Sequence, residues 1–137
     1  MVRFFFFIRF TLKNRRAIKL WLDQVAKKEK KSIEGVNYIF CDDDYLLEKN
    51  IKYLKHNTLT DIISFDYSKG DAFLGDVFIS TERVVENAVT LGVERTKELH
   101  RVMVHGLLHY CGYKDKTLKE KELMRMKEDY YLSLRTF

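Results

Sequence analysis

Residues 101–115 read RVMVHGLLHYCGYKD, and this segment predicts the centre of the fold. Between Val102 and Cys111 every residue except two histidines is apolar, small or aromatic. A helix that is apolar on nearly all sides is buried by its neighbours instead of lying on a surface. We therefore expect residues 94–111 to form a central helix, which Gly112 ends.

The two histidines of this helix, His105 and His109, predict a metal site. They are four positions apart, so they share one helical face with Cβ atoms about 5–6 Å from each other. A buried imidazole without a partner costs roughly 1–3 kcal/mol, and one cation can satisfy both rings. Gly112 lets the chain reverse, and Asp115 then offers the first oxygen ligand, whereas Cys111 points to another face. The expected ligands are His105, His109 and Asp115.

Other interpretations of this pattern stay open at the level of the sequence. Two histidines at this spacing are often ordinary buried residues that bond to the backbone. Two histidines and a carboxylate with an open position describe a catalytic zinc site, but also the site of non-haem iron oxygenases. The iron enzymes usually take their ligands from strands of a barrel. Protease zinc helices carry a Glu beside the first histidine, and Gly106 occupies that position here, which argues against peptide hydrolysis.

The rest of the chain predicts an α+β domain with one mixed sheet. Strand patterns cover residues 4–10, 35–41, 60–67 and 73–80, and a turn at 68–71 makes the last two an antiparallel hairpin. Helical patterns cover residues 15–30, 45–54, 81–91, 94–111 and 117–134. The expected caps are Asn14, Ser80 or Thr81, and a capping box of Thr117 with Glu120. No linker or repeat divides the sequence, so residues 1–137 are expected to form a single domain.

Composition indicates the compartment and the kind of partner. The chain has 25 basic and 20 acidic residues, a net charge of +5 and a pI of about 9.1. This excess favours an anionic partner such as RNA, although many small lysine-rich proteins bind no nucleic acid. Two cysteines are too few for a disulfide scaffold, and the apolar run at residues 4–8 is too short for an export signal or a membrane span. We expect a cytoplasmic protein.

Four segments resemble motifs of one known family. Residues 105–113, HGLLHYCGY, resemble the signature H-G-x-L-H-x-x-G-Y-D-H of the YbeY family of ribosomal RNA maturation endoribonucleases. TDIISF at 60–65, LGDVFIS at 74–80 and NIKY at 50–53 resemble the family's T-D-V-L-S-F, L-G-D-I-x-I-S and N-x-x-Y motifs. The matches occur in the family's order over roughly residues 46–116. The chain is therefore identified as a member of the YbeY family.

The resemblance implies a fold, an activity and partners. The implied fold is a mixed four-stranded sheet packed by about five helices, with a metal cleft beside the central helix. The implied activity is zinc-dependent cleavage of single-stranded RNA, with one Zn²⁺ or another divalent cation per chain. The implied partners are ribosomal RNA and small-subunit components, in rRNA maturation and late ribosome quality control, with no membrane and no DNA. No catalytic residue other than the metal ligands is assigned.

The sequence departs from the family pattern at two places. Lys114 stands where the family has Asp, and Asp115 stands where it has the third metal-binding His. Leu54 stands where the family usually has an Arg, whose guanidinium would stabilise a phosphodiester transition state. Candidate substitutes are Lys52, Lys55 and His56. These departures leave two alternatives open, a non-catalytic ribosome-assembly factor with a structural metal and a metal hydrolase of a non-RNA substrate.

Overall fold

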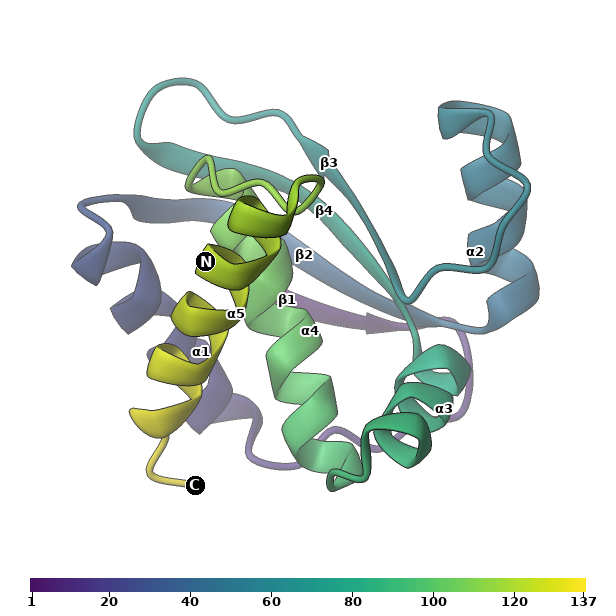
Figure 1. The fold of residues 1–137 in the computed structure, drawn as a ribbon. Coiled ribbons are helices and arrows are strands. Elements are labelled where there is room, and N and C mark those ends of the chain that lie inside the picture. The colour runs from purple at the N-terminus through teal and green to yellow at the C-terminus, as the bar shows by residue number, and fades with distance from the viewer.

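A computed structural model describes residues 1–137 as one four-stranded sheet with five α-helices (Figure 1). The elements in chain order are β1 (Val2–Phe6), α1 (Arg15–Lys28), β2 (Ser32–Cys41), α2 (Asp43–Lys49), the π-helical turn η1 (Asn50–Leu54), β3 (Ile62–Asp66), β4 (Ala72–Ser80), α3 (Thr81–Leu91), α4 (Arg95–Tyr110) and α5 (Leu118–Ser133). The expected α+β class is confirmed. None of the helices combines the length and apolar character that crossing a bilayer requires.

The sheet is mixed, and its strand order is β1-β2-β4-β3. β2 pairs in parallel with both β1 and β4, while β3 and β4 form the antiparallel hairpin predicted from the turn at residues 68–71. Parallel neighbours need a long crossover, and α1 provides the one between β1 and β2. The hairpin places β3, with its TDIISF segment, at an edge of the sheet.

The helix α4 lies in the middle of the helical side of the molecule, as its composition predicts. Figure 1 shows α4 (light green) between α5 (yellow) and α3, with α2 at the far side of the picture. Met103, Val104, Leu107 and Leu108 of α4 have no exposed surface. Burying each such side chain contributes about 1.5–3 kcal/mol, so α4 is a main source of the fold's stability.

Gly106 permits the close contact of α4 with the sheet. A Cβ at this position would lie 3.0 Å from Cδ1 of Ile62 and 3.1 Å from Cγ1 of Val77. A larger side chain would therefore push α4 away from β3 and β4. Gly106, which stands where protease zinc helices carry a Glu, is thus also a residue at which α4 lies close to β3 and β4.

Gly75 of β4 permits a second contact, at the end of α4. The Tyr110 hydroxyl donates a hydrogen bond to the carbonyl oxygen of Phe65 at 2.9 Å, across the sheet beside Gly75. A Cβ on Gly75 would lie 2.5 Å from this hydroxyl and closer still to the carbonyl oxygen of Phe65. This bond joins the last turn of α4 to β3, next to His109.

Substituting Gly75→Ala is expected to lower the free energy of unfolding by about 2–4 kcal/mol. The sum combines overpacking, which typically costs about 1–3 kcal/mol, with a lost hydrogen bond worth about 1 kcal/mol. Urea unfolding measures it. The control is Gly35→Ala, whose Cβ would meet only the flexible end of Leu74, at 3.2 Å. Equal losses in the two variants would contradict the assignment.

Several local predictions differ from the structure. The strand predicted at residues 4–10 is β1, which spans Val2–Phe6. Its partner β2 ends at Cys41, so the last hydrogen bond between them is the one from the Phe7 N–H to the Phe40 carbonyl, at 2.9 Å. The helix expected at 45–54 is α2 followed by the π-helical turn. Asn14 was wrongly predicted as a side-chain cap: its φ is 59°, and its carbonyl, not its side chain, accepts from the Ile18 N–H at 2.9 Å.

The caps of the later helices are confirmed. The Ser80 side chain accepts from the Arg83 N–H at the start of α3, and Thr117 with Glu120 forms the capping box of α5. Gly92 and Gly112 follow α3 and α4 with positive φ angles, as predicted for helix stops. These signals are local, so sequence alone sufficed to locate them.

Candidate metal centre

One face of α4 carries a row of polar side chains. Glu98, Arg101, His105 and His109 are separated by three, four and four positions, which places them on the same side of the helix. Two of them, Arg101 and His105, contact Glu128 of α5. The row therefore faces α5, while the other sides of α4 are buried in the core.

The C-terminus of α4 turns the chain back toward this face. Gly112 has a φ of 100°, and its N–H donates to the His109 carbonyl at 3.0 Å. The Tyr113 N–H donates to the Leu108 carbonyl at 3.2 Å, which completes a Schellman motif. The reversal carries Asp115 to the two histidines, as predicted.

The structure brings His105, His109 and Asp115 together. The two Nε2 atoms are 3.0 Å apart, and Oδ2 of Asp115 lies 3.2 Å from Nε2 of His105 and 3.4 Å from Nε2 of His109. Ligand atoms about 2.0–2.1 Å from a tetrahedral zinc lie about 3.3–3.4 Å from each other. The three donors therefore fit such a cation with little movement. Cys111 is not part of the group.

The other nitrogen of His105 is already occupied. Nδ1 lies 2.6 Å from Oε2 of Glu128, and because a carboxylate only accepts, Nδ1 carries the proton. The lone pair of the neutral ring is then on Nε2, the atom that faces Asp115 and His109.

The charges around His105 favour a positive charge on this ring. Burial lowers the pKa of His105, but the hydrogen bond and charge of Glu128, with the charges of Asp115 and Asp61, raise it above 6.5 overall. Surroundings that stabilise a second proton at Nε2 also stabilise a metal cation there. The electrostatics of the group are thus suited to a cation.

Glu128 and Arg101 are site residues that the sequence reasoning missed. Glu128 is only 5% exposed, and its Oε1 accepts from Nη1 of Arg101 at 3.1 Å. Nη2 of Arg101 lies 2.9 Å from Oδ1 of Asp129. A signal existed, because Glu128 follows Met124 by four positions and precedes Tyr131 by three, within the buried face of α5. A charge at such a position requires a partner.

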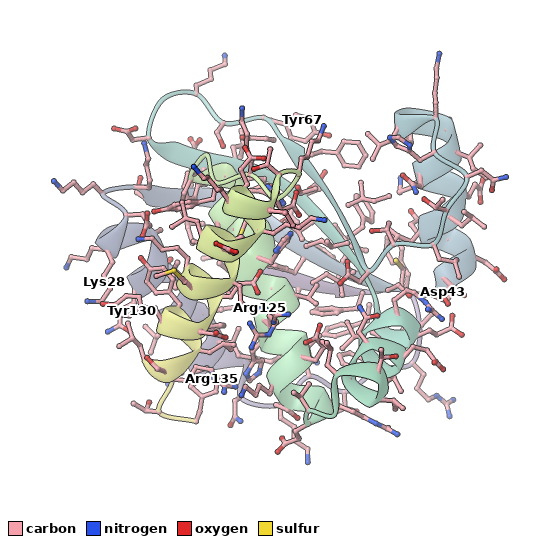
Figure 2. The ribbon with its side chains drawn as sticks, viewed as in Figure 1. Lys28, Asp43, Tyr67, Arg125, Tyr130 and Arg135 are labelled. Atoms are coloured by element: carbon pink, nitrogen blue, oxygen red, sulfur yellow. The ribbon has the colours of Figure 1, made fainter.

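A cleft of about 870 Å³ opens beside the three candidate ligands, between β3, α4 and α5. The part of the chain that follows α4 contributes three exposed cationic residues to this cleft, Lys116, Lys121 and Arg125. Figure 2 shows Arg125 on α5, next to α4. Leu54 also lines the cleft, but the candidate substitutes for the family's Arg do not. Those candidates were Lys52, Lys55 and His56.

Two carboxyl groups of the cleft are not among the candidate metal ligands. Burial raises the pKa of Asp61, and Oδ2 of this residue accepts from Nδ2 of Asn87 at 3.2 Å. Burial also raises the pKa of Glu98, which Arg101 partly offsets from 3.7 Å. Oε1 of Glu98 is buried and has no hydrogen-bond donor. Carboxyl groups with raised pKa values in a cleft are candidates for a functional role.

Comparison with known proteins identifies the family. The model of the family described as Endoribonuclease YbeY matches residues 8–135. The chain belongs to this family. The YbeY resemblance of residues 46–116 is thereby confirmed, and it extends over most of the chain.

Individual relatives agree with this assignment. A Flavobacterium johnsoniae protein named Endoribonuclease YbeY is 50% identical over 134 residues, which cover 98% of this chain and 96% of the relative. One from Cytophaga hutchinsonii with the same name is 54% identical over 130 residues, or 94% and 91% of the two chains. The solution structure of a Thermotoga maritima protein superposes with a TM-score of 0.67 at 27% identity, covering 97% of this chain and 87% of the other.

Replacing Asp115 by Ala is expected to weaken Zn²⁺ binding by more than about 100-fold. Losing a residue that only hydrogen-bonds to a metal ligand already costs roughly 10–100-fold in affinity. The physical reason is that only two nitrogen donors remain. Competition with a chromophoric chelator measures the affinity. Lys114→Ala, a change of the exposed neighbour, serves as control, and Asp115→His restores the family's ligand and retains binding. Unchanged affinity in Asp115→Ala would exclude it as a ligand.

Proposed function

We propose that this chain is a zinc-dependent endoribonuclease that cleaves single-stranded RNA in the maturation of small-subunit ribosomal RNA. The observation that carries the proposal is the convergence of His105, His109 and Asp115 at the wall of an open cleft. The name of the family and of its members supports the reaction class. The spacing of the donor atoms supports the dependence on a metal.

A catalytic role of the metal is favoured over a structural one. Structural zinc sites are closed by four protein ligands, whereas catalytic sites have three and an open position. The candidate group has three side chains, all of them partly exposed, and all three line the cleft. Two imidazoles and a carboxylate in tetrahedral spacing favour Zn²⁺, one per chain, among the common divalent cations.

Different residues of the cleft are assigned to metal binding and to binding of the scissile phosphate. When bound, the cation supplies Lewis-acid chemistry at a phosphoryl oxygen and activates water. Lys121 and Arg125 offer positive charge on the α5 side of the cleft, where they attract and orient the phosphodiester. We propose that they take over the role of the family's Arg, because Leu54, which also lines the cleft, carries no charge.

The surface next to the cleft supports a single-stranded substrate. Residues 51–59 are all exposed and include no acidic residue. Tyr53 is 52% exposed, and the Nζ atoms of Lys49 and Lys52 lie 5.2 and 5.3 Å from its ring centroid. An exposed aromatic ring among cations suits stacking of an unpaired base beside its phosphate. A paired strand would not offer its base faces.

The proposal includes the partners that the family resemblance implies. These are ribosomal RNA and components of the small subunit, in the cytoplasm and in late ribosome quality control. The net charge of +5 supports an RNA partner, because cations that neutralise phosphates release condensed counterions. No DNA substrate is proposed.

The purified protein is expected to cleave a labelled single-stranded RNA with Zn²⁺, and to leave it intact after chelation or in the His109→Ala variant. The variant keeps the fold but loses one of the donors, so metal and activity fall together. It also controls for contaminating nuclease. Equal cleavage by wild type and variant would contradict the proposal. Intact RNA with metal-loaded wild type would favour the ribosome-assembly alternative.

The double variant Lys121→Gln and Arg125→Gln is expected to bind single-stranded RNA more weakly, with unchanged Zn²⁺ affinity. Each lost phosphate contact reduces the slope of log affinity against log salt by about 0.7. Titration at several salt concentrations measures this slope. Lys119→Gln, which removes an exposed charge of α5 outside the cleft, is the control. An identical slope in the double variant would exclude these cations from the RNA interface.

A further inference from the structure

We propose that Glu128 of α5 is a positioning residue that prepares His105 for metal binding. By accepting the Nδ1 proton it selects the imidazole tautomer whose Nε2 is free, and it holds the ring with Nε2 toward the other two ligands. The inference deepens the proposed function, since it rests on the same metal site.

The contact between Glu128 and His105 is short and shielded from water. Oε2 of Glu128 lies 2.6 Å from Nδ1, and the two side chains are 7% and 19% exposed. Charge-assisted bonds of this kind are shorter and stronger than neutral ones. Because little water competes for either group, the carboxylate determines both the tautomer and the rotation of the ring.

The carboxylate is itself held in place from its other side. Oε1 accepts from Nη1 of Arg101 at 3.1 Å, so each oxygen of Glu128 has its own partner. Rotation of the carboxylate would break both bonds at once. Arg101 is anchored in turn by Oδ1 of Asp129 at 2.9 Å. Arg101 therefore holds the Glu128 carboxylate in the orientation that faces His105.

The two histidines differ in this respect. Nδ1 of His105 is held by Glu128, whereas the hydrogen bond of His109 is made through Nε2, the nitrogen that faces the ligand group. His109 is also more exposed, at 30% of its side chain. His105 is thus the pre-oriented ligand, and its orientation depends on the packing of α5 against α4.

A purely structural role for the same contacts makes a different prediction. If Glu128 only joined the two helices through Arg101, then removing its charge would change stability and leave metal affinity untouched. Asp129 offers the matched control, because it binds the same guanidinium, is 58% exposed and does not contact His105. The two residues therefore separate helix pairing from ligand positioning.

The test compares Glu128→Gln with Asp129→Asn in the full chain. Glu128→Gln is expected to lower the Zn²⁺ affinity of the metal-free protein by about 10–100-fold, whereas Asp129→Asn leaves it unchanged. Chelator competition measures affinity. ¹⁵N NMR of the imidazoles reports the tautomer of His105 without metal: protonated at Nδ1 in wild type and Asp129→Asn, and mixed in Glu128→Gln. Circular dichroism verifies the fold of each variant.

Wild-type affinity and an unchanged tautomer in folded Glu128→Gln would overturn the inference. Should that variant not fold, Glu128→Asp retains the charge on a shorter side chain and is expected to weaken Zn²⁺ binding, so unchanged affinity there would also overturn it. The proposed function fails separately. If wild type binds Zn²⁺ and cleaves RNA while both variants bind Zn²⁺ equally well, only the role of Glu128 is lost; if wild type binds no Zn²⁺, both are lost.

Discussion

Most of the helix α4 is buried while it carries two histidines, a glutamate and an arginine on one face, and this constraint organises the molecule. Leu107 and Leu108 are fully enclosed, yet His105 lies on the same helix. An unpaired buried charge or imidazole would offset much of the stability that this burial contributes. The polar row avoids this cost in two ways. Glu128 of α5 pairs with one part of the row, and the rest of the row faces an open cleft. The chain reverses at Gly112 beside this polar face of α4, and the reversal brings the carboxylate of Asp115 to the two histidines.

The sequence predicted those parts of the site that depend on local geometry. The four-residue spacing of the histidines and the glycine stop at Gly112 act within a few residues, so they located Asp115 beside the helix. Glu128 was missed because its partner lies 23 positions away, and only the packing of α5 decides which acidic residue turns inward. The π-helical turn and the left-handed conformation of Asn14 were also missed. The residue type of Asn14 permits both a side-chain cap and a left-handed conformation, so the sequence alone does not decide between them.

The two departures from the family pattern have different structural consequences. At the position of the family's third His, the Asp115 side chain is shorter than that of histidine and is acidic, but its Oδ2 still reaches both histidines. At Leu54 an apolar side chain stands where the family pattern has an Arg, while α5 contributes Lys121 and Arg125 to the same cleft. The first departure keeps a residue type that binds metals and alters its charge, whereas the second removes a charge from its position in the family pattern.

The order in which the centre's residues occur along the chain affects when it can form during translation. The sheet and the helix with both histidines are complete before Asp115 is added, and Glu128 follows in the next helix. The core residues Met124, Tyr131 and Leu132 come from the same last helix, so the core and the surroundings of His105 are completed together. A ribosome that stalls before α5 is made therefore carries a polypeptide with both histidines but without the carboxylate that holds His105.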